Sequence, residues 1–422
     1  MSSSAQGAEV ITLGCRLNLA ESERIRALLA GARDVVVVNS CAVTAEAVRH
    51  TRQANRRARR ALPDARLLVT GCAAEIERDR FAAMPEVDGL VPNAAKLDAR
   101  AWNAAPGAVA APPKHTRAFV AVQNGCDHAC TFCVIPQGRG ASRSLGVAQV
   151  LREVEAHLDR GAAEVVLTGV DVTSWGRDLP GCPPLGALVR AVLDAFPALR
   201  RLRRSSLDGI EIDAELFELF AGEPRVMPHL HLSLQHGHDL ILKRMRRRHS
   251  RADAVALVER LRARRPELAV GADLIAGFPT ENEEQHAANI SLVREVGVVH
   301  GHVFPFSPRP GTPAARMPQV DRTAIVRRAT ELRAALALSG KRDSGKVLRV
   351  AGSVPFCQNR QRLAEEGAQP IFAHSGHGGA QFSRAADDRR PVDLRHARGR
   401  CARARRIGED VAVDDRQLAH DR

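Results

Sequence analysis

"VQNGCDHACTFCVIPQGRGASRS", residues 122–144, places three cysteines within eight positions directly after an apolar run. Cys126, Cys130 and Cys133 have the spacing CxxxCxxC, and Phe132 precedes the last of them. A structural zinc site normally takes four nitrogen or sulfur ligands, often as two CxxC pairs, and the chain has no second pair. A cubane iron-sulfur cluster held by three thiolates leaves one iron free to chelate a substrate or cofactor. The spacing therefore favours such a cluster over zinc, with chance proximity as the remaining alternative.

On either side of this loop, short β-branched runs alternate with helical patterns. Upstream, the runs are EVITLG (9–14), DVVVVN (34–39) and RLLVT (66–70), with helices expected at 20–30 and 44–62. Such βαβ alternation predicts a doubly wound parallel sheet, which we place in an N-terminal domain over residues 1–98. The Ala/Pro/Gly-rich segment 99–115 is typical of a linker.

Downstream, residues 116–342 repeat the alternation. The expected strands are AFVAVQ, EVVLTGVDV, RLRRSS, HLHLSLQ, LAVGADLIAGF and HGHVFPFS, separated by helical patterns. Six or so strands joined by helices predict a full or partial α/β barrel. Residues 343–422 carry Arg/Ala/Asp/Gly clusters and few aliphatic runs, so we expect a poorly ordered tail.

Three further cysteines share a position relative to the N-terminal strands. Cys15, Cys41 and Cys72 each fall just past a strand, in LGC, NSC and TGC. Since the carboxyl ends of parallel strands share one edge of a sheet, these thiols can meet in space. We expect a second cluster there, again with one iron open. Three separately buried small thiols are the alternative.

Composition limits the class of protein. Lys plus Arg number 62 against 48 for Asp plus Glu, giving a net charge of +14. This excess fits a polyanionic partner such as nucleic acid, or a coding bias expressed as a solvated basic surface. No signal-like start and no apolar run of membrane-spanning length is present, so we expect a cytoplasmic location and no membrane association. Nine cysteines in 422 residues are too sparse for a secreted disulfide scaffold. Nothing in the sequence specifies the oligomeric state.

The cluster loop, CxxxCxxC with an aromatic residue before the last cysteine, resembles the signature of radical S-adenosylmethionine (SAM) enzymes. With the N-terminal cysteines it resembles the methylthiotransferase family of that superfamily, from about residue 9 to residue 340. The matching blocks include LGCRLNLAESE, VVNSCAVTAEAVRHTRQANRR, VTGCAAE, LTGVDVTSWG, RLRRSSLDGIEID, HLHLSLQHGHDLILKRMRR, ADLIAGFPTENEE and HVFPFSPRPGTPAARMP. RGASRS after the cluster loop, and CAVT before a basic helix, most resemble the bacterial branch that acts on threonylcarbamoyl-adenosine in tRNA.

The resemblance implies two [4Fe-4S] clusters and SAM as cofactors. The downstream trio Cys126, Cys130 and Cys133 would hold the cluster that cleaves SAM to a 5′-deoxyadenosyl radical. The upstream trio would hold an auxiliary cluster that carries sulfur. The methylthio group would go to carbon 2 of the adenine next to the anticodon, so the implied partners are the tRNA anticodon loop and an electron donor such as flavodoxin or ferredoxin.

Other residues are candidates for the cavity that the resemblance implies. Four could border the nucleoside: Phe132, Gly169, Ser206 and Ile275. Gln235 and Asp273 are candidates for the same cavity, although either could be a satisfied polar residue at a strand end.

Histidines near the cysteine loop and in one strand, and arginines in one helix, are further candidates for functional roles. His128 lies so close to the cysteines in sequence that we expect a bystander or surface role instead of a fourth ligand. HLHLSLQHGHD (229–239) has four histidines, which the alternation of a strand favours as barrel lining and loop over a metal site. The helix at 44–62 carries six arginines that could grip phosphates or form a solvated basic face: Arg49, Arg52, Arg56, Arg57, Arg59 and Arg60.

Alternatives to the tRNA threonylcarbamoyl-adenosine function remain open at this point. They are methylthiolation of isopentenyl-adenosine in tRNA or of a ribosomal protein, and a non-catalytic iron-sulfur RNA-binding relative. Members of the family usually end in a small β-barrel RNA-binding module, and residues 343–422 do not match one. A shifted reading frame in GC-rich coding sequence is our hypothesis for that tail.

Overall fold

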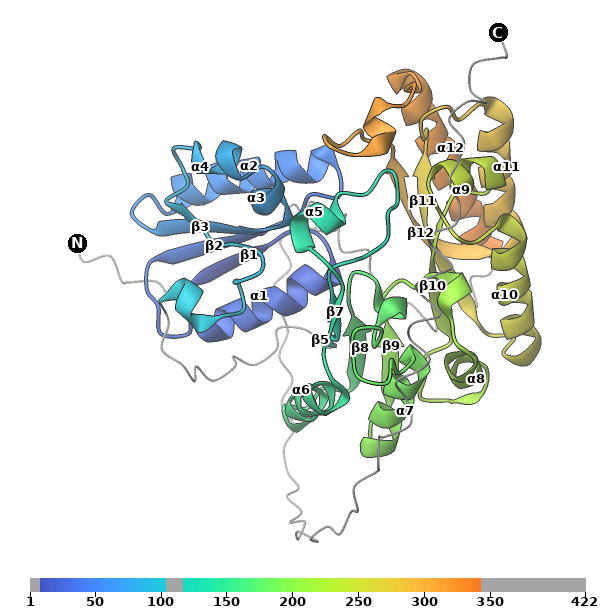
Figure 1. Ribbon diagram of the computed structural model, residues 1–422, viewed down its shortest axis with the longest axis horizontal. Coiled ribbons are helices and arrows are strands. Elements are labelled where there is room, and N and C mark those ends of the chain that lie inside the picture. Colours follow the sequence, from blue (N-terminus) through green and yellow to red (C-terminus); the bar gives the residue numbers. More distant parts are fainter. Residues whose placement is uncertain (1–7, 104–116, 343–422) are drawn as a thin grey trace, which may run out of the picture. The chain divides into compact units, whose positions relative to one another are not determined.

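The computed structural model describes residues 8–103 and 117–342 of the chain (Figure 1). The expected tail at 343–422, and the expected linker beyond residue 103, lie outside these ranges. Both described segments are α/β, as the sequence predicts. Among the described residues, no helix has the length and apolar character needed to cross a bilayer.

The first segment forms a four-stranded parallel sheet. Its strands are β1 (Glu9–Thr12), β2 (Val35–Ser40), β3 (Arg66–Gly71) and β4 (Gly89–Leu90), hydrogen-bonded in that order. Helix α1 (Arg16–Leu28) covers one face, and α2 (Ala45–Ala61), α3 (Cys72–Ile76) and α4 (Arg78–Ala82) cover the other (Figure 1). A short helical turn, Ala99–Trp102, follows the sheet.

Helices cover both faces because the β2 sequence VVVV is apolar at every position. Val36 and Val38 pack with Val48 of α2, whereas Val37 packs with Ile25 of α1. Successive side chains of a strand point to opposite faces, so an unbroken valine run can be buried only between two layers of helices.

The second segment is a partial barrel of six parallel strands. Strands β5 (Ala118–Ala121), β8 (Glu164–Thr168) and β9 (Arg201–Arg204) form one sheet. Strands β10 (His229–Gln235), β11 (Ala269–Ala276) and β12 (Val298–Pro305) form the other, and a bridge between Leu207 and Leu232 connects the two. In the described residues β5 and β12 each pair on one side only, which leaves the barrel open.

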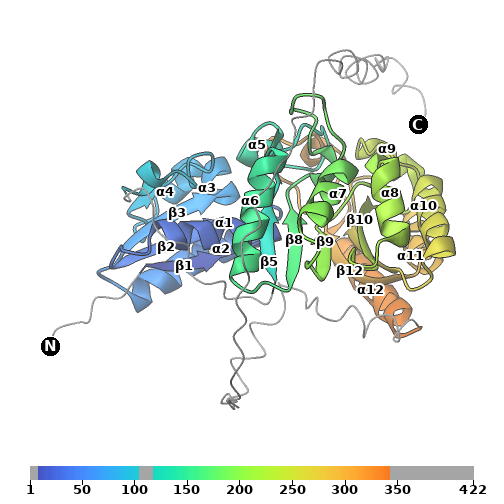
Figure 2. The ribbon, with the colours of Figure 1, turned by 90° about the horizontal axis from the view of Figure 1, so that it is seen from below.

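The outer layer of this barrel is helical. Figure 2 shows α6, α7, α8, α10 and α11 ranged along the outside of the strands. Their bounds, with those of α9 and α12, are α6 (Val147–Asp159), α7 (Leu185–Ala195), α8 (Ala214–Gly222), α9 (Asp239–Arg244), α10 (Arg251–Arg264), α11 (Glu283–Glu295) and α12 (Arg322–Arg342). Apolar residues four apart form their inner faces: Val150 and Val154 of α6, and Leu257 and Leu261 of α10, belong to the main core. Burying each such side chain contributes roughly 1.5–3 kcal/mol.

The cysteine loop is enclosed by a small hairpin at the end of β5. Strand β6 (Gln123–Asn124) pairs antiparallel with β7 (Arg143–Ser144), and α5 (Ile135–Arg139) lies between them. Three 3-10 turns occupy other connections: Val172–Ser174, Gly209–Glu211 and Pro313–Arg316.

Sequence reasoning missed some elements. Helix α1 begins at Arg16, four residues before the expected start, because the extended backbone of Cys15 already serves as its N-cap. Strand β4 is only two residues long, too short to show alternation. Helix α12 was not expected, although its Ala329 and Leu332 lie in the main core.

Candidate active site

The downstream cysteine loop is held by backbone hydrogen bonds at both ends. The Cys126 N–H donates to the Gly140 carbonyl at 3.1 Å, and the Cys133 N–H donates to the Cys130 carbonyl at 3.1 Å. The middle of the loop is tied to α9, since Thr131 Oγ1 donates to the Arg244 carbonyl at 2.8 Å. The loop therefore has a defined shape with all three thiols half-buried.

The thiols of this loop interact with one another. Burial, and then the neighbouring Cys130, raise the pKa of Cys133 to about 12. Burial and the Asp171 carboxylate raise the pKa of Cys126, and Cys130 and Cys133 add to the effect. Because each thiolate disfavours the others, the trio needs a cationic centre to be stable as three thiolates.

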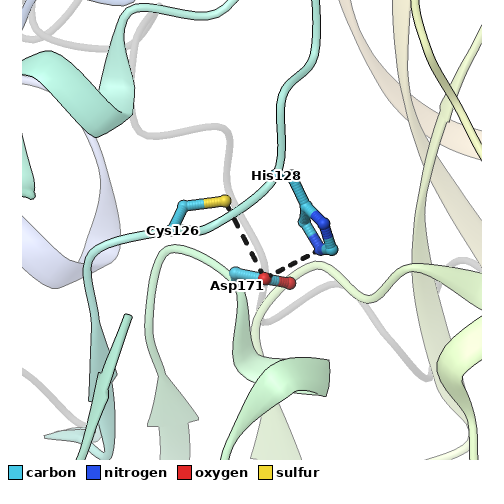
Figure 3. A group of neighbouring side chains, drawn as sticks. All are labelled: Cys126, His128 and Asp171. Atoms are coloured by element: carbon cyan, nitrogen blue, oxygen red, sulfur yellow. Dashed lines mark hydrogen bonds and ion pairs between the residues drawn. The ribbon is translucent and has the colours of Figure 1, made fainter. Parts of the chain in front are cut away.

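Asp171, in the turn after β8, places its carboxylate beside this loop. Its Oδ2 lies 3.8 Å from the Cys126 sulfur and 2.9 Å from His128 Nε2 (Figure 3). Hydrogen bonding to Asp171 and to Glu211 raises the pKa of His128 to about 9. Of the two roles expected for His128, the surface position is wrong, since its side chain is only 19% exposed and contacts these two carboxylates. That it is a bystander and not a fourth ligand stays a prediction.

A buried arginine, Arg247, also approaches this loop. Arg247 Nη1 lies 3.6 Å from the Cys130 sulfur, and Nη2 donates to Asp208 Oδ2 at 2.8 Å. A guanidinium beside a thiol favours the thiolate. Sequence reasoning did not single out Arg247, Asp208, Asp171 or Glu211. The sequence marked these residues only by their place in the quoted blocks that follow predicted strands.

The upstream cysteines converge as the strand-end argument predicts. A Cβ built on Gly14 would lie 2.7 Å from the Cys41 sulfur, so the β1 turn approaches the β2 turn closely. Burial, and then the nearby Cys15 and Cys72, raise the pKa of Cys41 to about 12. Cys72 is fixed as the first residue of α3, because Ser40 Oγ accepts from the next two backbone N–H groups at 3.1 Å each. Cys41 and Cys72 are buried and Cys15 is exposed.

A buried ionic network connects the two cysteine trios. Glu21 of α1 pairs with Lys96 Nζ at 2.6 Å and with Arg139 Nη1 at 2.9 Å, and all three side chains are 1% exposed. Arg139 ends α5, six residues after Cys133. Burial opposes its charge, but the Cys72 thiolate and Glu21 raise the pKa of Arg139 well above its usual range. Helix α5 also packs against the upstream trio, because a Cβ on Gly138 would lie 3.2 Å from Cys72 Cβ.

The donor chemistry of both trios fits [4Fe-4S] clusters. Each trio offers three sulfur atoms and a guanidinium that favours thiolates, Arg247 for one and Arg139 for the other. In the network around Glu21, two buried cations, Lys96 and Arg139, share one carboxylate. The network therefore has an excess positive charge that can balance an anionic cluster. A cubane with three thiolate ligands carries net negative charge in its oxidised state.

Alternate residues of β10, β11 and β12 line the barrel interior. The ring centroids of His231 and His302 lie 5.3 Å apart, and those of His300 and His302 lie 5.4 Å apart. Asp273 lies between them: its Oδ1 is 3.0 Å from His231 Nε2 and 2.8 Å from His302 Nδ1. Asp273 is therefore a lumen residue in the middle of β11, and not a strand-end residue.

The other two histidines of the HLHLSLQHGHD block belong to the loop after β10. His236 is buried against Glu281 at 3.3 Å, and His238 caps α9 by accepting from the Leu240 N–H at 3.2 Å. The interpretation of this block as barrel lining and loop is confirmed.

The remaining candidate cavity residues lie at strand ends or beside them. Phe132 and Ile275 pack in the same apolar cluster. Gly169 and Ser206 follow the ends of β8 and β9, and Gln235 ends β10 with a left-handed φ of 62° at a register shift. These ends lie on the side of the barrel where the cysteine loop follows β5, which is the side where such barrels carry their sites.

Gln123 is a buried residue that sequence reasoning missed. Its Oε1 accepts from the N–H groups of Val170 and Asp171 at 3.0 and 2.8 Å, and its Nε2 donates to the Gly125 carbonyl at 2.7 Å. One amide thus ties the turn after β8 to the cysteine loop. A Cβ on Gly169 would lie 2.8 Å from the Gln123 carbonyl oxygen, so this turn has no room for a side chain.

Most arginines of α2 have carboxylate partners. Arg49 pairs with Glu46, Arg52 with Glu77, Arg56 with Glu86 at 3.7 Å, and Arg59 with Asp88 at 2.5 Å. Arg57 and Arg60 are exposed. This pairing lowers the positive charge that α2 can offer to phosphates, and favours the solvated-face interpretation.

Comparison with known proteins gives matches over both described segments. Residues 120–293 match the family described as "Radical SAM superfamily", and residues 8–92 match "Uncharacterized protein family UPF0004". The chain is 46% identical to the threonylcarbamoyladenosine tRNA methylthiotransferase MtaB of Rickettsia prowazekii, over 77% of this chain and 82% of that protein. It is 35% identical to a tRNA-2-methylthio-N(6)-dimethylallyladenosine synthase of Cereibacter sphaeroides, over 73% and 78% respectively. Among solved structures, the radical S-adenosylmethionine methyltransferase TsrM of Kitasatospora setae matches with a TM-score of 0.48 and 15% identity, over 70% of this chain and 68% of that one.

Proposed function

The chain belongs to the methylthiotransferase family of radical SAM enzymes, and we propose that it adds a methylthio group to carbon 2 of threonylcarbamoyl-adenosine next to the anticodon of tRNA. The Rickettsia prowazekii relative named for this substrate, at 46% identity, supports it over dimethylallyl-adenosine, whose Cereibacter sphaeroides relative is 35% identical; a Bacillus subtilis relative named for the threonylcarbamoyl substrate is 33% identical. The observation that carries the proposal is the convergence of two cysteine trios, connected by the Glu21–Arg139 ion pair. A methylthiolation needs a radical generator and a sulfur source side by side.

The downstream trio would hold one [4Fe-4S] cluster and the upstream trio the other. Bound together with SAM, they supply the 5′-deoxyadenosyl radical and the sulfur that inert C–H bonds require. The chain itself positions these groups. Gln123 fixes the turn after β8 against the cysteine loop, and Arg139 fixes the end of α5 against the upstream trio.

Charge around the downstream trio is arranged for a polar cofactor. Asp171, Asp208 and Glu211 are buried carboxylates at the strand ends, which can accept hydrogen bonds from hydroxyl and ammonium groups. Protonated His128 contacts Asp171 and Glu211, and Arg247 pairs with Asp208, so cations balance these carboxylates. Phe132 and Ile275 supply an apolar border for the nucleoside.

The reaction also needs partners outside the chain. We propose that a flavodoxin or ferredoxin reduces the downstream cluster and that the tRNA anticodon loop presents the adenine. We assign residues 1–98 to the auxiliary-cluster domain and residues 116–342 to the radical SAM core.

The direct test is anaerobic incubation of reconstituted protein with SAM, reductant and tRNA, followed by nucleoside mass spectrometry. The expected products are 5′-deoxyadenosine and 2-methylthio-threonylcarbamoyl-adenosine. Cys126→Ala should abolish both products, whereas Cys72→Ala should abolish only the methylthio product.

Parallel reactions on tRNA carrying dimethylallyl-adenosine, and on ribosomal protein, discriminate the alternatives. Modification of either, with none on threonylcarbamoyl-adenosine, would overturn the substrate assignment. Absence of 5′-deoxyadenosine from the wild type would indicate a non-catalytic relative.

A further inference from the structure

Arg16 is a charged residue without a partner at the open side of the barrel. It is the first residue of α1, directly after Cys15, and it is half-buried. Within residues 8–103 and 117–342 it donates no hydrogen bond and forms no ion pair. Burying a cation without a partner costs free energy, so such a residue is suited to an anionic ligand.

The guanidinium of Arg16 interacts electrostatically with residues of the barrel lumen. Burial lowers its pKa, and Asp273 is the largest opposing influence. The pKa of His300 is lowered to about 4, first by burial, then by His302 and His231, and next by the charge of Arg16. Helix α1 packs against β5, at one edge of the open barrel. Arg16 therefore faces the lumen histidines across that opening.

The lumen wall near Arg16 is polar. His302 is 41% exposed although it lies on a strand. His231 Nδ1 and His229 Nε2 are buried and have no hydrogen-bond partner among the described residues. The Asp273 oxygen is already satisfied by its two imidazole bonds, without a metal ion. These features describe a polar stretch of the lumen wall beside Arg16, with two imidazole nitrogens that have no partner among the described residues.

We infer that Arg16, beside the lumen wall that carries His231, Asp273 and His302, binds the carboxylate of the threonylcarbamoyl group. This inference rests on the proposed function and extends it to substrate specificity. The adenine carbon that receives sulfur and the carbon that bears the N6 substituent both flank N1 of the same ring. A substrate placed with carbon 2 at the Cys15 trio therefore directs its N6 substituent into the immediate neighbourhood, where Arg16 follows Cys15.

The same guanidinium would discriminate against a dimethylallyl group. That group has no atom able to accept a hydrogen bond, so it would leave Arg16 desolvated and unpaired. Sites built to hydrogen-bond a substrate group reject analogues that lack it much more strongly than apolar pockets reject extra atoms. Threonylcarbamoyl and dimethylallyl substrates would thus be discriminated by Arg16, and not by the groups that carry out the radical chemistry.

The test compares Arg16→Gln, Arg16→Lys and wild type on three anticodon stem-loop RNAs. These carry threonylcarbamoyl-adenosine, its carboxylate methyl ester, or dimethylallyl-adenosine. We expect Arg16→Gln to lower kcat/KM on the first RNA by about 30-fold, the size of a lost charge-assisted hydrogen bond, and to have little effect on the ester. Arg16→Lys should stay within about threefold of wild type, because it keeps the charge.

Controls separate this role from others. Arg57→Gln removes one exposed charge and should affect all three RNAs equally. Iron content should be unchanged in Arg16→Gln, which excludes damage at Cys15. SAM also carries a carboxylate, so a rise in the KM for SAM, with the ester and acid RNAs equally affected, would assign Arg16 to SAM and overturn the inference.

Binding of the same RNAs, measured by fluorescence anisotropy without turnover, keeps the inference testable if the proposed reaction fails. Wild type should prefer the acid over the ester, and Arg16→Gln should lose that preference. Equal affinity of wild type for acid and ester would refute the inference, whatever the catalytic assay gives. Loss of turnover with the preference intact would refute the proposed function alone.

Discussion

Replacing Glu21 by Gln tests the buried network between the two cysteine trios. Glu21 faces both Lys96 and Arg139, and none of the three side chains is more than 1% exposed. Burial would raise the pKa of Glu21, but the Lys96 and Arg139 charges lower it below its usual 4.5. The variant would leave two buried cations with only a neutral amide between them. Removing one partner of a buried pair costs about 3–5 kcal/mol, and since Gln can still accept hydrogen bonds we expect about 3 kcal/mol.

Urea denaturation of the reduced protein without iron measures this loss. Trp102 reports on the network directly, because its Nε1 donates to the Lys96 carbonyl at 2.8 Å. A Trp175→Phe background removes the other tryptophan, so that fluorescence follows the N-terminal sheet alone. Glu46→Gln is the matched control: its partner Arg49 is on the surface of α2, and no measurable change is expected.

The pH dependence gives a second check. A carboxylate with a lowered pKa stabilises the fold fully above its usual pKa, and that stability is lost as the pH falls through the lowered value. Wild type should therefore lose stability more steeply than Glu21→Gln as the pH falls below about 4.5. A loss in Glu21→Gln of less than about 1 kcal/mol, or one equal to that of Glu46→Gln, would refute the assignment of the network as a structural link.

Three other changes have defined outcomes. Gln123→Leu removes the acceptor for two backbone N–H groups of the turn at Asp171, so we expect a loss of about 2 kcal/mol in unfolding free energy and a higher KM for SAM. Gly71→Ala puts a Cβ 2.5 Å from a backbone oxygen of β2 at a φ of +92°, and should destabilise the sheet in thermal melts, whereas Gly31→Ala, with nothing within 4 Å, should not. For His300, burial and the neighbouring charges of His302, His231 and Arg16 outweigh Asp273 and lower the pKa to about 4. The contribution of His300 to the free energy of unfolding is therefore complete above the usual pKa of 6.5 and is lost as the pH falls toward 4. His300→Gln should flatten this decline of stability with falling pH, and an unchanged slope would contradict the prediction.

Structural features were predicted correctly from the sequence where a single local pattern specified them. The valines of β2 indicated a strand buried on both faces, and the cysteines at strand ends indicated one shared edge. Helix starts were less predictable, because the cap of α1 is a cysteine with no capping side chain.

The parts that sequence could not give are pairings between distant segments. Gln123 and Asp171 are 48 residues apart, and Glu21 and Arg139 are 118 apart. Nothing in local periodicity shows which acid meets which base. The same holds for His128, whose neighbours in the chain suggested a surface position. It holds also for Arg16, which is notable because no carboxylate of the described residues forms an ion pair with it, although Asp273 lies near enough to influence its pKa.

Iron content per chain tests the central claim, that two separate cysteine trios each bind one cubane cluster. Anaerobically reconstituted wild type should hold about eight irons, because each cubane contributes about four. Replacing Cys15, Cys41 and Cys72 by alanine should leave about four irons and a cluster that still cleaves SAM. Replacing Cys126, Cys130 and Cys133 should leave about four irons and no SAM cleavage. A full iron load in either triple variant, or about four irons in the wild type, would contradict the account.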